Sequence, residues 1–180
     1  MKDLKGTKTE ENLKKAYAGE SQARVKYEFY ASQAKKDGFE QIKAIFEETS
    51  GNEKEHAKMW FKLLHGGKVQ DTLTNLKDAA SGENYEYTEM YVEMAEDARE
   101  EGFDDIADKF EKVAAIEKEH ETRFLKLAEN IENSEVFTKK TEVVWKCRNC
   151  GSVYIGTDAP EVCPVCDHPK AYYEVAAFNY

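Results

Sequence analysis

One pattern of residues occurs twice along the chain, and both copies have the same internal spacing throughout. It runs from a tyrosine through a Gly-Phe pair to Glu-x-x-His, from Tyr27 to His56 in the first copy and from Tyr91 to His120 in the second. Such a repeat indicates repeated structural units. Apolar residues recur at helical spacing in this part of the chain, so we expect each copy to be a pair of helices.

Residues that begin and end helices divide the repeats into four long helices. Thr7 and Glu10 predict a capping box at the start of the first helix. Gly38 and Gly102 predict the end of the first helix of each pair, and Gly66 with Gly67 the end of the second helix. The expected helices span residues 8–36, 40–65, 73–101 and 104–132. Two such hairpins, joined by a crossover through residues 66–74, can pack as an all-α four-helix bundle with pseudo-twofold symmetry.

The composition changes near residue 140. All four cysteines and all three prolines lie beyond this point, whereas the part of the chain before it contains neither type. With 180 residues, the chain is long enough for one main domain and a small appendage. We therefore expect a helical domain at residues 1–140 and a small metal domain of strands and loops at residues 141–180.

The charge of the chain narrows its range of partners. There are 36 acidic and 26 basic side chains, which gives a net charge of -10. This balance argues against nucleic acid or an anionic membrane surface as the main partner. No stretch approaches the roughly 20 apolar residues of a spanning helix, and the N-terminus is charged almost from its first residue. We therefore expect a cytoplasmic protein.

Both repeats end in a Glu-x-x-His motif, whose two side chains project from one helix face about a turn apart. One such motif in so acidic a helical chain is usually a solvated face. Two at equivalent points of a repeat favour a metal site, because a Glu-x-x-His from each of two helices plus a Glu from each of the other two is the ligand set of di-iron and di-manganese bundles. The residues that supply this set are Glu20, Glu53, His56, Glu83, Glu117 and His120.

The two copies differ just after the first glutamate of the set. Glu20 and Glu83 are one position closer in sequence than Tyr27 and Tyr91, so the register between the copies changes there. In the second copy Glu86 adds a carboxylate one turn after Glu83, although a surface acid is an alternative interpretation. Seven candidate ligands suggest that one iron exchanges partners with oxidation state, with Glu86 bound in the ferric state and His56 in the ferrous state.

Tyr27 and Tyr91 occupy equivalent positions shortly after the glutamates Glu20 and Glu86. Each could donate a hydrogen bond to a ligand carboxylate and so assist the chemistry at the metals. A structural role is equally compatible with a buried tyrosine.

The four cysteines form two Cys-x-x-Cys pairs separated by 12 residues: Cys147, Cys150, Cys163 and Cys166. In a chain expected to be cytoplasmic, this spacing indicates a metal site rather than disulfides. Both zinc and iron accept tetrahedral sulfur coordination, so a structural zinc ribbon is an alternative. Iron is favoured because nearby aromatic residues could shield the site, and because a di-iron site that reduces an oxidant needs a source of single electrons.

Taken together, these segments resemble the rubrerythrin family over nearly the whole chain. The matching segments are Gly19-Glu20-Ser21-Gln22-Ala23-Arg24, Glu53-x-x-His56, Gly82-Glu83-x-x-Glu86-Tyr87, Glu117-x-x-His120 and the two cysteine pairs. The resemblance implies a ferritin-like bundle followed by a rubredoxin-like domain. It also implies seven di-iron ligands (Glu20, Glu53, His56, Glu83, Glu86, Glu117 and His120), with Glu53 and Glu117 as bridges, and one further iron held by the four cysteines.

The same resemblance implies a function. The implied function is that of a peroxidase, which reduces hydrogen peroxide to water and protects against oxidative stress. The resemblance also implies a homodimer or a larger homo-oligomer. The reducing equivalents would come from an NAD(P)H-dependent reductase or a small rubredoxin-type electron carrier. Three other functions are compatible with the same residues: a ferroxidase or iron-handling protein, an electron carrier with a structural bundle, and a zinc-ribbon interaction module.

Overall fold

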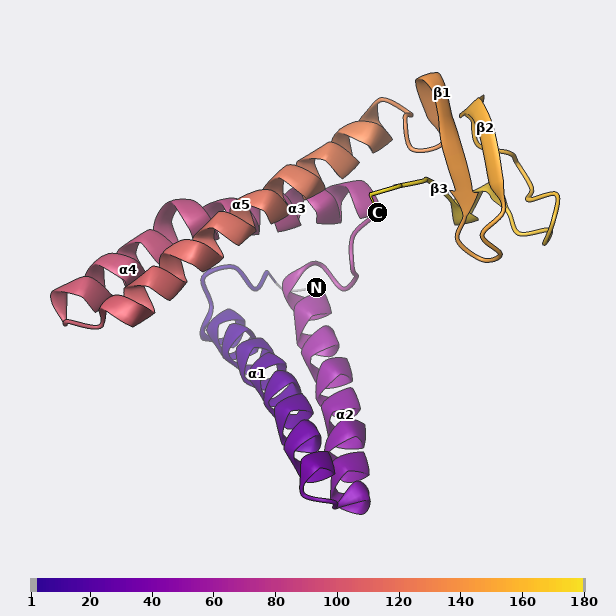
Figure 1. Ribbon diagram of the computed structural model, residues 1–180. Coiled ribbons are helices and arrows are strands. Elements are labelled where there is room, and N and C mark those ends of the chain that lie inside the picture. The colour runs from indigo at the N-terminus through magenta and orange to yellow at the C-terminus, as the bar shows by residue number, and fades with distance from the viewer. Residues whose placement is uncertain (1–2, 180) are drawn as a thin grey trace. The chain divides into compact units, whose positions relative to one another are not determined.

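The computed structural model describes residues 3–179 and consists of two compact units that divide between Gln70 and Asp71. The first unit is a helical hairpin of α1 (Lys8–Lys36) and α2 (Glu40–Leu64), shown in indigo to purple in Figure 1. Both helices lie at or within one residue of the expected ranges. Among the described residues, no helix is both long and apolar enough to cross a membrane.

The second unit contains a further helical hairpin and the strands. One arm of the hairpin is α3 (Thr72–Tyr85), the π-helical segment η1 (Glu86–Met90) and α4 (Tyr91–Glu100), and the other arm is α5 (Asp104–Glu132). The third expected helix is thus present, but a π-turn interrupts it. This turn lies between Glu83 and Tyr91, where the second copy has one residue more than the first. A π-turn accommodates one additional residue in a continuous helix, so it explains the change of register.

The expected helix ends are confirmed, with one change at the first of them. Thr7 caps α1 by accepting a hydrogen bond of 3.1 Å from the backbone N–H of Glu10. The Glu10 carboxylate accepts from the backbone N–H of Gly6 at 2.7 Å instead of returning to Thr7. The Thr7 amide donates to the carbonyl of Leu4, so the reciprocal half of the capping box is replaced by an adjacent turn.

Gly38 and Gly102 end the first arm of each hairpin in the same way. Their φ angles are 84° and 85°, a left-handed conformation that glycine adopts without strain. In both cases the amide of the following Phe donates to the carbonyl of the Ala that lies four residues before the glycine, as in a Schellman motif. The repeat seen in the sequence is therefore also a repeat of local structure.

Small residues lie between the helices of each hairpin. Ala31, Ala34, Ser50 and Ala57 are the buried residues of the first hairpin, and the Ser50 hydroxyl donates to the carbonyl of Arg24 at 3.1 Å. Large apolar side chains remain exposed on both hairpins: Val25, Ile45, Met59, Val92, Ile106 and Ile116. Each hairpin therefore presents an apolar surface that two helices alone do not bury.

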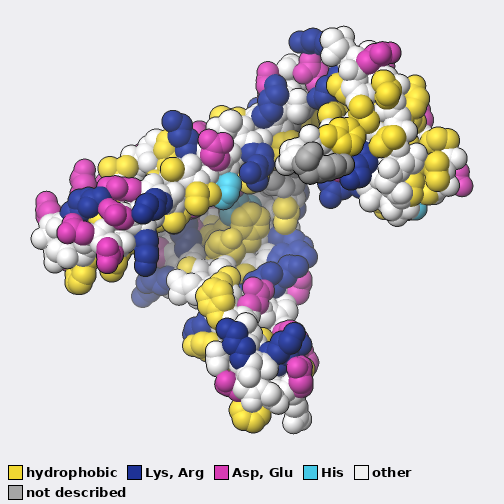
Figure 2. Space-filling model, in the orientation of Figure 1, with side chains coloured by type: hydrophobic (Ala, Val, Ile, Leu, Met, Phe, Trp, Pro, Cys, Tyr) yellow, Lys and Arg dark blue, Asp and Glu magenta, His cyan; other side chains and the backbone are white. Residues whose placement is uncertain are grey.

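The C-terminal strands form a small antiparallel sheet in the order β2-β1-β3. Their bounds are β1 (Thr138–Cys147), β2 (Val153–Asp158) and β3 (Tyr173–Val175), and a 3-10 turn η2 (Lys170–Tyr172) precedes β3. Trp145 and Cys147 of β1 are fully buried in one cluster with Cys163, which follows β2 in the chain, and the Trp145 indole N–H donates to the carbonyl of Gly156 at 3.0 Å. Apolar side chains also gather on the visible surface of this part of the molecule, shown in yellow in Figure 2.

Candidate metal centres

The first hairpin brings together three of the expected ligands. Glu20 extends from α1, and Glu53 and His56 extend from α2, with one possible ligand atom of each within 4.8 Å of the others. The Nδ1 atom of His56 lies 2.9 Å from a Glu53 carboxylate oxygen and 3.9 Å from a Glu20 oxygen. The i,i+3 spacing of Glu53 and His56 aligns both side chains on the helix face toward α1.

The second hairpin repeats this arrangement with Glu83 from α3 and with Glu117 and His120 from α5. The Nδ1 atom of His120 lies 2.7 Å from Glu117 and 3.7 Å from Glu83, close to the corresponding distances of 2.9 Å and 3.9 Å in the first hairpin. Two carboxylates and one imidazole thus converge in each hairpin. Hard oxygen donors with an imidazole suit iron and manganese.

The close carboxylates affect one another's pKa. The pKa of Glu20 is raised, mainly by a hydrogen bond with Glu53 and then by burial. This is expected where two acidic groups share a site, because a proton between them relieves the repulsion of like charges. A cation bound at the same oxygens would relieve that repulsion as well, so the donor set fits a metal ion.

Glu86 lies outside the triad of the second hairpin but within its electrostatic reach. It is the first residue of η1. Its pKa is raised, first by burial and then by the charges of Glu83 and Glu117. The additional carboxylate is therefore partly buried and near enough to Glu83 and Glu117 for their charges to act on it.

The two tyrosines also occupy equivalent environments. The Tyr27 ring lies 6.0 Å from that of Phe46, and the Tyr91 ring lies 5.9 Å from that of Phe110, both in tilted contacts. The pKa of Tyr91 is raised, first by burial and then by the charge of Glu86. These contacts show packing for both residues and proximity to the carboxylates for Tyr91, and their assistance to the chemistry remains a proposal.

A polar network near the second triad was not anticipated from the sequence. The Glu121 carboxylate accepts hydrogen bonds from the Tyr87 hydroxyl at 2.8 Å and from the Asn84 amide at 2.9 Å. The same amide also approaches the Tyr87 hydroxyl at 3.2 Å. The first hairpin has Ala57 where the second has Glu121, so the repeat comparison contained a signal for this difference.

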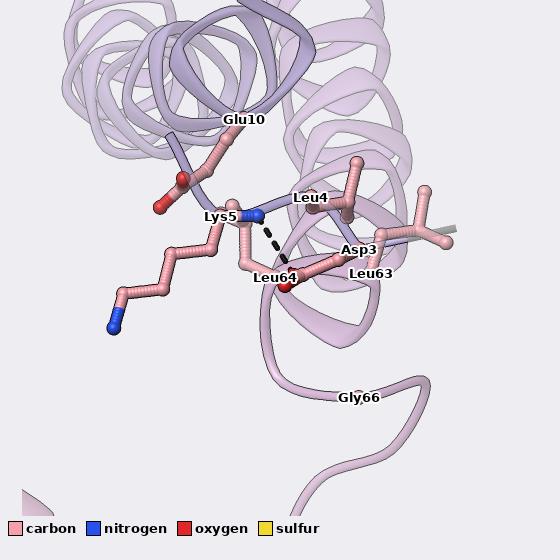
Figure 3. Close-up of a pocket in the computed structure, with 7 residues that line it drawn as sticks. All are labelled: Asp3, Leu4, Lys5, Glu10, Leu63, Leu64 and Gly66. Carbon is pink, nitrogen blue, oxygen red and sulfur yellow. Dashed lines mark hydrogen bonds between the residues drawn. The ribbon is translucent and has the colours of Figure 1, made fainter. Parts of the chain in front are cut away.

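A surface pocket of the first unit lies away from the triad. Figure 3 shows it beside the start of α1 and the end of α2, where the Lys5 amide donates a hydrogen bond to Asp3. Glu10 lines this pocket, and Glu20 follows ten residues later, about 15 Å along the helix. The pocket is thus separate from the cluster of metal-binding side chains.

The four cysteines converge in the C-terminal domain, with their sulfur atoms within 4.8 Å of one another. The sulfurs of Cys147 and Cys166 are 3.8 Å apart, and those of Cys150 and Cys163 are 3.7 Å apart. A tetrahedral ion with metal–sulfur bonds of about 2.3 Å holds its sulfurs about 3.8 Å apart, so this cluster fits one ion.

Two similar turns shape the sulfur cluster. In each, the amide of the residue four positions after the first cysteine donates to that cysteine's carbonyl, at 2.8 Å for Gly151 and 2.9 Å for Asp167. The pKa of the Cys163 thiol is lowered to about 6, mainly by the backbone N–H of Val165. Such amides stabilise a thiolate, which is the form that binds metal.

Comparison with known proteins agrees with both kinds of site. The Rubrerythrin family model matches residues 11–128, and the model of the rubrerythrin rubredoxin-like domain matches residues 145–174. The chain belongs to the rubrerythrin family. A rubrerythrin of Nitratidesulfovibrio vulgaris is 50% identical over the full length of both chains, and one of Porphyromonas gingivalis is 48% identical over 99% of this chain and 95% of the other. A solved structure of nigerythrin in a mixed-valence state is 30% identical over 98% of this chain and 91% of the other, with a TM-score of 0.36.

Family membership establishes the fold class, the cofactors and the broad activity. The helical region is ferritin-like and the C-terminal domain is rubredoxin-like. The cofactor is iron at both kinds of site, as a di-iron centre in the ferritin-like region and as one ion at the four cysteines. The protein is thus an oxidoreductase, as expected from the sequence.

Proposed function

We propose that this protein is a non-haem di-iron peroxidase that reduces hydrogen peroxide to water in the cytoplasm and protects against oxidative stress. The observation that carries the proposal is the presence, in one chain, of two equivalent Glu-Glu-His triads and a four-thiolate cluster. The triads suit a centre that delivers two electrons at once. The thiolate cluster suits a carrier that restores them one at a time.

The proposed di-iron ligands are the two triads together with the additional carboxylate: Glu20, Glu53, His56, Glu83, Glu86, Glu117 and His120. Glu53 and Glu117 would serve as the bridging carboxylates, and their exposed side-chain fractions, 16% and 14%, are the lowest of the two triads. Bound iron supplies two electrons and polarises the oxygens of the substrate. The reaction also consumes two protons per peroxide and forms two water molecules.

Side chains beside the triads can supply the protons. In the metal-free protein, burial and the neighbouring carboxylates raise the pKa of Glu86, so this group can carry a proton whenever it is not bound to iron. Tyr91 lies within the influence of the same carboxylates, and Tyr27 is its counterpart in the first hairpin. We assign these groups to the transfer of protons to the departing oxygen.

The proposed electron path enters through the four cysteines of residues 141–180, which act as a separate domain from residues 1–140. An NAD(P)H-dependent reductase or a small rubredoxin-type carrier delivers the electrons. We also propose a homodimer or a larger homo-oligomer, as the resemblance to the rubrerythrin family implies. A molar mass of 20.6 kDa by light scattering would contradict this assembly.

The peroxidase proposal is tested by mixing fully reduced protein, without oxygen, with either hydrogen peroxide or air-saturated buffer. The visible colour of the ferric thiolate centre should return much faster with peroxide. Glu53→Ala should lose this advantage, whereas Glu55→Ala should keep it, because the Glu55 side chain lies two residues away and is 62% exposed.

Other outcomes distinguish the competing functions. Peroxide consumption that survives Glu53→Ala would favour an electron carrier with a structural bundle. Oxidation and accumulation of many added ferrous ions per chain would favour an iron-handling protein. Tightly bound zinc with no redox colour, after growth in iron-replete medium, would favour a zinc ribbon.

A further inference from the structure

Tyr173 is a buried residue of the four-cysteine domain. It is the first residue of β3, where it pairs with Cys147 of β1, and only 4% of its surface is exposed. It belongs to the same packed cluster as Trp145, Cys147 and Cys163. The side chain is therefore part of the immediate surroundings of the sulfur atoms.

The hydroxyl group of Tyr173 has no hydrogen-bond partner among residues 3–179. Buried polar groups are almost always paired, because an unpaired one loses its hydrogen bonds to water without replacement. The neighbouring Trp145 follows this rule, since its indole N–H donates to the carbonyl of Gly156. A phenylalanine would fill the same apolar space as Tyr173 without leaving an oxygen unpaired.

Apart from Trp145, whose N–H is already paired, the side chains of this packed cluster that can form hydrogen bonds are those of Cys147, Cys163 and Cys166. Besides the backbone N–H of Val165, Tyr173 lowers the pKa of the Cys163 thiol. Burial and then the Cys163 sulfur raise the pKa of Tyr173 itself. The unpaired hydroxyl is thus packed among the cysteine side chains of the metal site.

We propose that the Tyr173 hydroxyl donates a hydrogen bond to the Cys163 thiolate of the iron-loaded centre and thereby raises its reduction potential. Four thiolates around ferric iron carry one net negative charge, and reduction to ferrous iron adds a second. A donor to sulfur stabilises the more negative state more, so it favours reduction. Tyr173 is thus a positioning and tuning residue for the electron entry site, and this role rests on iron at the cysteines rather than on peroxide as the substrate.

The test is the midpoint potential of the four-cysteine iron in the full-length, iron-loaded protein, measured by spectroelectrochemistry. Tyr173→Phe removes only the hydroxyl and should lower the potential. We expect a decrease of up to tenfold in the equilibrium constant for reduction, which is about 59 mV for a one-electron couple. The matched control is Tyr172→Phe, which removes a hydroxyl from the adjacent, 41% exposed tyrosine and should leave the potential unchanged.

A potential for Tyr173→Phe that equals or exceeds that of the unaltered protein would overturn the proposal. A fall of equal size in both variants would overturn it as well, because the effect would then be nonspecific. If Tyr173→Phe does not retain iron, the hydrogen bond can be tested instead by NMR of the unaltered protein loaded with an NMR-active cadmium isotope. A slowly exchanging Tyr173 hydroxyl proton with a scalar coupling to cadmium supports the hydrogen bond, and its absence refutes it.

Discussion

The Tyr87 hydroxyl donates a hydrogen bond of 2.8 Å to the carboxylate of Glu121, and this contact joins η1 to α5 next to the second triad. The first hairpin has no carboxylate at the corresponding position, because Ala57 occupies it. The two triads therefore have nearly identical internal distances but different neighbouring hydrogen bonds. Only the second hairpin, which also carries Glu86, has a polar side-chain network beside its triad.

We expect Tyr87→Phe to destabilise the second hairpin, because it removes the hydrogen bond to Glu121. The Glu121 carboxylate would keep only its bond from Asn84, so the free energy of unfolding of the second hairpin should fall by about 1–2 kcal/mol. Chemical denaturation followed by circular dichroism measures this change. Tyr85→Phe, on the exposed side of the same helix, should have no comparable effect, and equal losses in both variants would contradict a specific role for the network.

The π-turn at η1 should be required for the function of Glu86. Deletion of Thr88 gives Glu83 and Tyr91 the same spacing as Glu20 and Tyr27, so a regular helix could replace the turn. We expect unchanged helix content but peroxide turnover as low as in Glu86→Gln. Thr88→Ala keeps the length of the helix and should retain turnover. Full activity after the deletion would show that the π-turn is not required. Full activity in Glu86→Gln would contradict a role for Glu86 and remove the hypothesis of ligand exchange.

Lowering the pH should weaken metal binding by Glu20 and Glu86 while the pH is still above 4.5, the ordinary pKa of glutamate. The pKa values of Glu20 and Glu86 are raised in the folded protein, so these groups bind protons that compete with the metal. In the metal-free protein the same shifts add stability below pH 4.5, and this contribution is lost as the pH rises through the folded-state pKa. Anaerobic ferrous-ion titrations at several pH values test the competition. Constant affinity down to pH 4.5 would contradict it.

Trp145 should dominate the stability of the C-terminal domain, because it is fully buried and its indole N–H is paired. Trp145→Ala should lower the free energy of unfolding of this domain by about 3–5 kcal/mol. The unfolding of this domain can be followed by the loss of ferric thiolate absorbance with increasing denaturant. The circular dichroism of the helices should change little between the variant and the unaltered protein. Ile155→Ala, on the neighbouring strand with 64% exposure, should stay within about 0.5 kcal/mol of the unaltered protein.

Most of the local structure could be predicted because single residues with strong preferences specify it. Gly38 and Gly102 end helices through a positive φ angle, and the Thr7 hydroxyl caps the first helix. The Glu-x-x-His spacing brings its side chains together within one helix, so each triad needs only one residue from a second helix. The cysteine cluster is predictable for a similar reason, because paired turns bring its sulfurs together.

Other features depend on contacts that the sequence pattern does not encode. Nothing in the sequence pattern links Glu121 to Tyr87, 34 positions earlier in the chain, and only the fold brings the two side chains together. Tyr173 looked like part of a general aromatic shell, and only its burial among the cysteines distinguishes it from Tyr172. The Glu10 side chain pairs with Gly6 rather than Thr7, because the preceding turn already pairs the Thr7 amide.

The π-turn at Glu86–Met90 also limits how such a two-copy chain can diversify. An insertion into a regular helix rotates every following side chain by about 100°, which would have moved Tyr91 and the rest of that arm out of register with α5. A π-turn confines the insertion to a few residues, so the correspondence with the first copy resumes at Tyr91. A duplicated hairpin could thus gain new chemistry in one half while both halves kept the same packing surface.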